Sequence, residues 1–196
     1  AQGIHTDFIH LPEGNSRINV KVKHGDETEI NGQGPVITEE AINELFAKLD
    51  TLTKEDILVL AGSIPNTLPE DIYEKILASL ESKGIRVVVD ATKDLLLNVL
   101  KYHPFLIKPN NHELGEMFGT VCKTDEDIVH YAKKLQEKGA VNVLISMAGD
   151  GAILITEDGQ NIKMGTPKGK VVNSVGAGDS MVAGFITGYI RGGNYE

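Results

Sequence analysis

The sequence predicts an α/β protein with a mainly parallel sheet flanked by helices, preceded by a β-hairpin. Continuous apolar runs at 57–60, 85–89 and 141–145 suit strands that are covered on both faces. Segments with helical apolar spacing separate these runs, and such alternation is typical of a parallel sheet. With 196 residues, the chain is long enough for one well-packed domain.

The expected elements follow one another in a regular order. Residues 17–23 alternate between polar and apolar side chains, which predicts a half-buried strand. A turn signal at Gly25-Asp26 returns the chain into a second strand at 28–31, and a helix is expected to start at Thr38. The remaining expected elements are helices at 69–83, near 93–100, near Glu113 and at 124–138, a strand at 105–107, and an antiparallel pair at 152–155 and 160–164.

Composition narrows the classes of function. The formal net charge of -9 argues against nucleic acid or an anionic membrane as the main partner. No apolar run is long enough to span a bilayer. The single cysteine, Cys122, rules out a disulfide within these residues and fits a reducing compartment, with a structural role. We therefore expect a cytoplasmic protein with no nucleic-acid or membrane partner.

The segment 173–185 says most about chemistry. Gly176, Ala177 and Gly178 let backbone N–H groups converge, and the helix that follows makes its N-terminus a natural seat for phosphate. Asp179 stands at the edge of this predicted phosphate site, where its carboxylate could face a substrate hydroxyl. An anion cradle beside a base suits phosphoryl transfer. By itself, however, the segment is equally compatible with a tight turn that Asp179 caps.

Two other glycine motifs fit poorly. A dinucleotide-binding fingerprint needs glycine where Met181 stands. A P-loop needs Gly-Lys-Ser/Thr at a set spacing, and the run at 165–171 lacks both the spacing and the hydroxyl.

Polar and small residues gather after the predicted strands, at 61–65, 90–92, 108–113 and 146–151. The carboxyl ends of parallel strands meet at one edge of a sheet, where ligands bind in such folds. The sequence therefore predicts a ligand site at this edge.

Five motifs occur in order: Arg17-Ile18-Asn19-Val20-Lys21, Ile30-Asn31-Gly32-Gln33-Gly34-Pro35, Gly62-Ser63-Ile64-Pro65, Lys108-Pro109-Asn110 with Glu113, and Val175 to Gly184. As a set they resemble the ribokinase/PfkB family of sugar kinases, over essentially the whole chain. The resemblance implies a Rossmann-type core with a β lid. The lid would include residues 16–32 and the kinase core residues 33–196, with 1–15 as an incomplete N-terminal part.

The resemblance also implies an activity. Members use Mg-ATP, and the likeness is greatest to those that convert fructose 1-phosphate to fructose 1,6-bisphosphate, so ATP and Mg²⁺ are the expected cofactors. Phosphorylation of tagatose 6-phosphate is the alternative within the family. An alternative from another class is a module that binds nucleotide or sugar phosphate without catalysing transfer. Family members often dimerise through the lid, so a homodimer is expected here.

At matching positions, the resemblance implies roles for individual residues. Asp179 would be the catalytic base, and Gly176, Ala177 and Gly178 would form the anion hole for the transferred phosphoryl group. Lys108 would help to bind the nucleotide.

Asn110 and Glu113 match a motif tied to Mg²⁺ and phosphate handling, so they are expected to bind the cofactor and, indirectly, the metal. The alternative is a helix cap with a carboxylate in the first helical turn.

Other matches concern the substrate and the nucleotide. Arg17 and Ser63 would contact the sugar phosphate, the alternatives being a solvated strand charge and a turn hydroxyl. Ser146 and Gly151 would contact ATP, in a loop where Ala148 stands at a position usually held by glycine.

The chain begins close to the lid strand and stops soon after the motif helix. In family members an earlier segment supplies contacts to the sugar hydroxyls, and later helices close the nucleotide pocket. We therefore expect these residues to be a piece of a longer protein.

Overall fold

The computed structural model describes residues 3–24 and 26–195. These fall into two compact units, one formed by residues up to 56 with 63–85, the other by 57–62 with the residues from 86 onward. Gly25, part of the expected turn, lies outside the described residues. The lid and core boundaries expected from the sequence stay a prediction.

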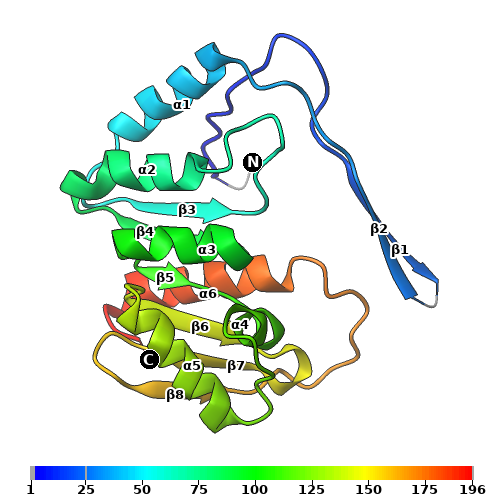
Figure 1. The fold of residues 1–196 in the computed structure, drawn as a ribbon, viewed down its shortest axis with the longest axis vertical. Helices are drawn as coiled ribbons and strands as arrows, with labels where there is room; N and C mark the ends of the chain where they lie inside the picture. The colour runs from blue at the N-terminus through cyan, green and yellow to red at the C-terminus, as the bar shows by residue number, and fades with distance from the viewer. Residues whose placement is uncertain (1–2, 25, 196) are drawn as a thin grey trace. The chain divides into compact units, whose positions relative to one another are not determined.

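The first unit contains a strand pair and two helices (Figure 1). Thr38 caps α1 (Glu39–Asp50) by accepting a hydrogen bond of 3.3 Å from the amide of Ala41. α2 (Ile72–Leu80) continues into a short 3₁₀ turn, Glu81–Lys83. In that turn the Lys83 ammonium lies 2.6 Å from a carboxylate oxygen of Asp50, which ties the ends of the two helices together.

The strands β1 (Asn19–His24) and β2 (Asp26–Asn31) pair antiparallel. Val20 stands opposite Ile30 and Val22 opposite Thr28, so the alternating pattern puts the apolar side chains on one face. These side chains are more exposed than a half-buried strand requires, with Val20 at 46% and Ile30 at 60%. Local alternation identified the strands, but burial depends on what packs against them.

The second unit is built on a six-stranded sheet in the order β3-β4-β5-β6-β7-β8. The first four strands run parallel and the last two pair antiparallel, as expected from the sequence. The strands are β3 (Ile57–Ala61), β4 (Arg86–Asp90), β5 (Leu106–Ile107), β6 (Asn142–Ser146), β7 (Ala152–Ile155) and β8 (Asn161–Met164).

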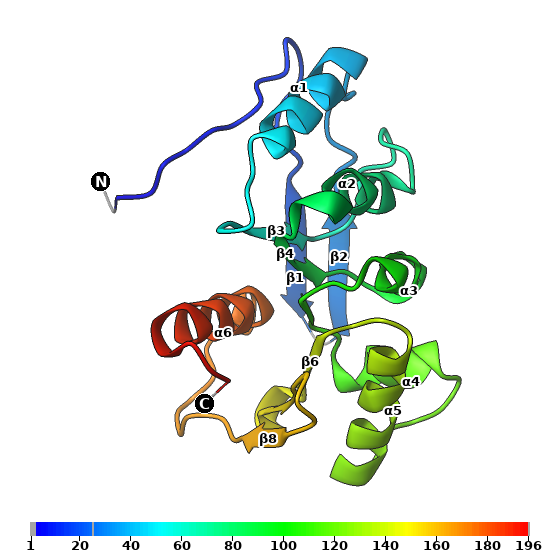
Figure 2. The same ribbon diagram turned by 90° about the vertical axis from the view of Figure 1, so that its left-hand side faces the viewer.

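Helices cover both faces of this sheet. α6 (Ala177–Gly192) lies on one side, and the other three helices lie on the opposite side (Figure 2). Those three are α3 (Lys93–Val99), α4 (Asn111–Met117) and α5 (Asp125–Glu137). Two 3₁₀ turns, Leu100–Tyr102 and Ala148–Asp150, complete the unit. The predicted α/β class is confirmed.

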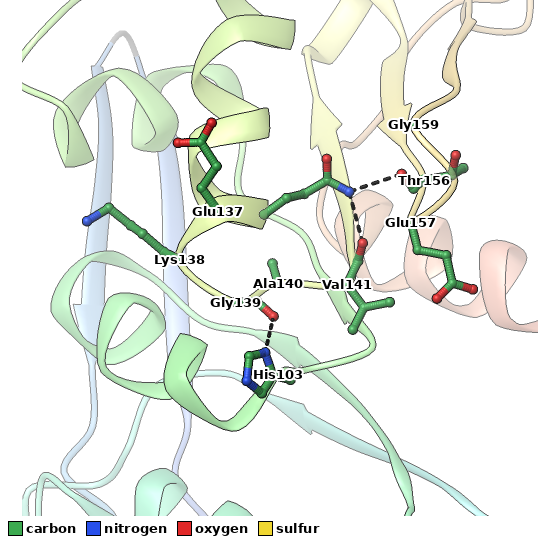
Figure 3. Close-up of a pocket in the computed structure, with 10 residues that line it drawn as sticks. His103, Glu137, Lys138, Gly139, Ala140, Val141, Thr156, Glu157 and Gly159 are labelled. Carbon is green, nitrogen blue, oxygen red and sulfur yellow. Dashed lines mark hydrogen bonds between the residues drawn. The ribbon is translucent and has the colours of Figure 1, made fainter.

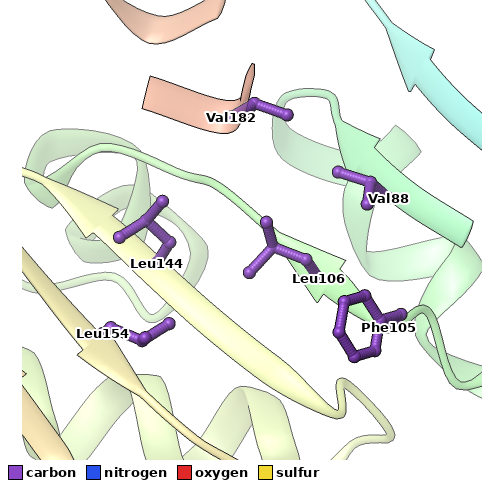
Figure 4. Packing of buried hydrophobic residues seen from close by; sticks show 6 residues of the cluster. All are labelled: Val88, Phe105, Leu106, Leu144, Leu154 and Val182. Atoms are coloured by element: carbon purple, nitrogen blue, oxygen red, sulfur yellow. The ribbon is translucent and has the colours of Figure 1, made fainter. Parts of the chain in front are cut away.

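The core beneath α6 is apolar and buried. Val182 of α6 faces side chains from β4, β5, β6 and β7, drawn in Figure 4: Val88, Leu106, Leu144 and Leu154, with Phe105 before β5. Val88 and Leu106 are fully buried. Burying side chains of this size stabilises a fold by about 1.5–3 kcal/mol each, so this packing holds α6 against the sheet.

Within the described ranges, no helix combines the length and the apolar composition needed to cross a membrane. Cys122 is 8% exposed, and burial, with a smaller effect of the Asp127 charge, raises the pKa of its thiol. A raised pKa disfavours the reactive thiolate, which supports the interpretation of Cys122 as a structural residue.

Candidate functional site

Two charged residues meet at the carboxyl ends of the central strands. Asp90 ends β4 and Lys108 directly follows β5, its parallel neighbour. The Lys108 ammonium lies 3.2 Å from a carboxylate oxygen of Asp90, and the Lys108 side chain is only 9% exposed. A buried ammonium is costly unless it is paired, and Asp90 supplies the opposite charge.

The start of α6 lies beside this pair. Gly176 is the N-cap residue, with a φ of +80° that favours glycine, and among the described residues no side chain caps this end of the helix. The amide of Ser180 donates to the Gly176 carbonyl over 2.9 Å. Within the described ranges, no group accepts from the amides of Gly178 and Asp179. Unpaired amides at a helix start, together with the helix dipole, favour an anion.

Ala177, the first residue of the helix, behaves differently from its two glycine neighbours. Its amide donates to the carbonyl of Ser174 over 3.1 Å, closing a turn before the helix. Of the three residues expected to form an anion hole, Ala177 is therefore the one whose N–H is already committed.

Lys108 adds a full positive charge to this helix start. A Cβ built on Gly178 would lie 3.1 Å from the Lys108 ammonium nitrogen, so the two groups are almost in contact. Asp179 is exposed, and no described group donates a hydrogen bond to its carboxylate. The arrangement can bind an anion and leaves a carboxylate available to accept a proton.

Asp90 and Asp179 both line a pocket of about 400 Å³. The other lining residues are mainly small or apolar: Val59, Ala61, Val182, Ala183, Ile186 and Thr187. The Lys108 ammonium pairs with the Asp90 carboxylate and not with that of Asp179. A hydroxyl group in this pocket would therefore meet one carboxylate that is paired with a positive charge and one that is not.

Asn110 and Glu113 form a capping box at the start of α4. Asn110 Oδ1 accepts from the Glu113 amide and Glu113 Oε2 accepts from the Asn110 amide, each over 2.8 Å. In this structure Asn110 and Glu113 therefore cap the helix, which is the alternative that the sequence left open. A bridge between Asn110 and Ser146 also places the start of α4 beside the end of β6.

These residues fit a magnesium ion only if other groups share its coordination. No cluster of three or more His, Cys, Asp or Glu side chains that could hold a metal occurs in the part of the chain that the structure describes. Mg²⁺ usually keeps several waters and binds through one or two carboxylates plus substrate phosphates. The second carboxylate oxygen of Glu113 lies outside the capping box, so the site suits an ion that a nucleotide brings.

The loop after β6 contains Ser146 and Gly151. Ala148 has a φ of +47°, in the left-handed region that favours glycine. Gly151 has a φ of +91°, and a Cβ there would lie 2.0 Å from the carbonyl oxygen of Met164. The fold itself therefore requires glycine at Gly151, whatever the loop binds.

In the first unit, the structure brings together the two residues predicted to contact substrate. The Arg17 guanidinium donates to the Ser63 hydroxyl over 2.8 Å, across 46 positions of the sequence. A Cβ on Gly34 would lie 3.3 Å from the Cβ of Arg17, so this glycine lets the chain pass close to the arginine stem.

A second pocket lies where β5 and β6 begin, at the end of the strands opposite to Lys108 (Figure 3). The Gln136 side-chain amide donates to the carbonyls of Val141 and Thr156, and His103 Nδ1 lies 3.1 Å from the Gly139 carbonyl. These polar groups satisfy one another. None of the residues predicted to form the site lines this pocket.

The prediction from sequence assigned no role to Asp90. It noted the segment 90–92 only as one of the polar stretches after a strand. The available signal was its position: Asp90 directly follows a buried apolar run, next to the strand that ends at Lys108.

Comparison with known proteins identifies the family of the chain. Residues 1–196 match the model of the pfkB family carbohydrate kinases. The 1-phosphofructokinase of Bacillus subtilis (strain 168) is 54% identical over 187 residues, which cover 95% of this chain and 61% of the relative. The D-tagatose-1-phosphate kinase of Bacillus licheniformis is 37% identical over 182 residues, covering 92% of this chain and 59% of the relative.

Among solved structures, Arabidopsis thaliana ribokinase complexed with ribose and ATP superposes with a TM-score of 0.70 at 21% identity, covering 94% of this chain and 61% of that chain. This likeness shows the fold, which is ribokinase-like as expected. The chain spans about three fifths of the length of each of these relatives.

Proposed function

The chain belongs to the pfkB family of carbohydrate kinases, and we propose that the protein transfers the γ-phosphoryl group of ATP to a hydroxyl group of a small sugar phosphate. The observation that carries the proposal is the position of the Lys108 ammonium beside Gly178, at the start of α6. Asp179 stands at the same helix start, and its carboxylate accepts no hydrogen bond from the described residues. Positive charge, amide donors and a base are the parts that phosphoryl transfer needs.

In the proposed reaction, the sugar hydroxyl attacks the γ-phosphorus while Asp179 accepts the hydroxyl proton. The bond to the bridging oxygen of ATP breaks and ADP leaves with its electron pair. The Gly178 amide and Lys108 stabilise the negative charge on the transferred group, and Gly176 and Ala177 shape the turn that presents the amides. In a loose transition state, this alignment carries much of the catalysis.

The nucleotide would lie along the carboxyl ends of the central strands. Ser146 and Gly151 would contact it, and Lys108 would bind its phosphates. When bound, Mg²⁺ would neutralise charge on those phosphates. Asn110 and Glu113 would face the ion through water, with their capping box holding the start of α4 in place.

The sugar we propose is fructose 1-phosphate, phosphorylated on its 6-hydroxyl to fructose 1,6-bisphosphate. The name of the Bacillus subtilis relative supports this choice. Arg17, held by Ser63, would bind the phosphate of the substrate through its planar fork of N–H donors. The name of the Bacillus licheniformis relative supports D-tagatose 1-phosphate as a second candidate.

We place this reaction in the cytoplasm and propose that the protein forms a homodimer through the β1–β2 pair. The exposed apolar side chains of Val20, Val22 and Ile30 lie on this small sheet, and that of Ile18 stands directly before β1. A second copy of the same face would remove them from water. Light scattering should give the dimer mass, and a Val20→Glu variant should give the monomer mass.

The test of activity is coupled ADP release with Mg-ATP, offering fructose 1-phosphate, D-tagatose 1-phosphate, tagatose 6-phosphate and fructose 6-phosphate in parallel. Turnover selective for fructose 1-phosphate supports the main proposal, and selectivity for a tagatose phosphate supports an alternative. ATP binding without ADP formation on any sugar would identify a binding module and contradict the proposed kinase.

A further inference from the structure

We propose that Asp90 is a positioning residue, which holds the Lys108 ammonium against the anion-binding start of α6. Asp90 would act through Lys108 and would not itself touch the transferred phosphoryl group. The inference rests on the proposed phosphoryl transfer, because it assigns a role within that site.

Asp90 is well placed to serve as a fixed anchor. It is the last residue of β4, in register with Ala61 of β3. Its backbone carbonyl accepts a hydrogen bond of 3.1 Å from the amide of Gly62. Because two paired strands hold the backbone, the carboxylate projects from a rigid part of the sheet. Sites on strands hold their side chains more accurately than sites on loops.

Lys108 needs such an anchor. The lysine side chain has a flexible four-carbon stem and a compact charge, so the stem alone does not fix where the ammonium lies. Here the ammonium lies 3.2 Å from Asp90 on one side and 3.1 Å from the Cβ position of Gly178 on another. An ammonium has three N–H donors, so one can serve Asp90 while others serve a phosphate oxygen.

The two carboxylates of the pocket thereby receive different roles. Asp90 is paired with Lys108 and 20% exposed, whereas the Asp179 carboxylate accepts no hydrogen bond from the described residues. The Asp90 carboxylate is already engaged by the Lys108 ammonium, whereas the Asp179 carboxylate is open to a hydroxyl group in the pocket. Asp179 is therefore the better base, and Asp90 the better anchor.

The test is a double-mutant cycle on kcat, using Asp90→Asn, Lys108→Met and the double variant. With Asp90→Asn we expect kcat to fall about 10- to 100-fold, with a smaller change in the KM for the sugar phosphate. A fall of this size is typical when a catalytic group is misplaced. In the Lys108→Met background, Asp90→Asn should cause no further loss, because the group it positions is gone. Asp125→Asn is the matched control. Asp125 belongs to α5, on the side of the sheet opposite to α6, and its carboxylate lies 2.5 Å from the Lys163 ammonium. The kcat of this variant should equal that of the wild type.

Asp90→Asn leaves a buried ammonium with a neutral neighbour, which can impair folding. Comparing the double variant with Lys108→Met avoids this problem, because neither variant contains the buried ammonium. Equal kcat values support the positioning role. A wild-type kcat in Asp90→Asn, or a further loss in the double variant, would overturn it.

A binding measurement separates this inference from the proposed function. If the wild type turns over no sugar phosphate, the proposed kinase activity fails by itself. Inorganic phosphate is then titrated while the NMR signal of the Gly178 amide is followed. A Kd at least about 5-fold weaker in Asp90→Asn than in Asp125→Asn would support the positioning role. Equal affinities would overturn it.

Discussion

Three helices of the second unit carry a carboxylate at the same position, the third residue after the N-cap, but they use it in two ways. In α4 and α5, Glu113 and Asp127 fold back and accept hydrogen bonds from the backbone amides before them. At the start of α6 the N-cap is glycine, and no amide in the described part of the chain donates to the Asp179 carboxylate. The first two helix starts are closed by their own side chains, whereas the third is open.

This difference shows how a helix start becomes a binding site. A capping side chain satisfies the same amides that a bound anion would need. Replacing a capping residue by glycine costs only a few tenths of a kcal/mol, far less than replacing it by alanine. The fold therefore loses little by leaving α6 open, and Gly178, Asp179 and Lys108 remain available for chemistry.

The largest effect is expected from removing the carboxylate at the open helix start. Asp179→Asn should lower kcat by about 10²- to 10⁴-fold, the usual contribution of a general base. Asp127→Asn removes the charge at the equivalent position of α5 and should leave kcat unchanged. Steady-state kinetics on both variants test the comparison, and similar losses in the two would refute it.

The next largest effect on kcat is expected from adding a methyl group at the anion-binding start of α6. Gly178→Ala should lower kcat about 10-fold or more, because the added methyl group would meet the Lys108 ammonium at 3.1 Å. Folding should survive, since the contact is with the end of a flexible side chain and alanine favours a helix.

Gly188→Ala is the matched control, because a Cβ there meets nothing within 4 Å. It should raise the free energy of unfolding by about 1 kcal/mol, as expected for Gly→Ala inside a helix, with unchanged kcat. Denaturant titration and kinetics measure both quantities. A normal kcat for Gly178→Ala would argue against phosphate binding at this amide.

A smaller effect separates capping from catalysis at α4. Asn110→Ala and Thr124→Ala each remove the N-cap side chain of a capping box and should each lower the free energy of unfolding by about 1 kcal/mol. If Asn110 also handles phosphate or Mg²⁺, only Asn110→Ala should lower kcat. Equal stability losses with normal kcat in both would show that Asn110 acts as a cap alone.

The smallest expected effect is a pH dependence of the folded state's stability, caused by Asp127 at the capped start of α5. Hydrogen bonds from the amides of Lys123 and Thr124 lower the pKa of Asp127 from its ordinary value of 3.8. A lowered pKa means that the ionised carboxylate stabilises the folded state above pH 3.8, and that this contribution is lost as the pH falls through the lower, folded pKa. An NMR titration of the Asp127 carboxyl carbon checks this, and a midpoint at or above 3.8 would contradict it.

The order of elements, the mixed sheet and the chain's family were all predictable from the sequence, because they depend on local patterns. Apolar runs identified the buried strands, and the short motifs carried the resemblance. The helix at 124–138 was predicted as well, and its capping box depends on residues only three positions apart. The roles of the predicted site residues stay predictions until they are tested.

Only the tertiary structure decided which distant residues meet. Asp90 and Lys108 come together because β4 and β5 are neighbours, and Lys108 reaches Gly178 because the chain returns to the same edge of the sheet at α6. Likewise, no local pattern shows that Gly151 passes against Met164. Local hydrogen bonds and hydrophobic periodicity depend on residues that are close in sequence, whereas the pairing of buried charges depends on which strands are neighbours in the sheet.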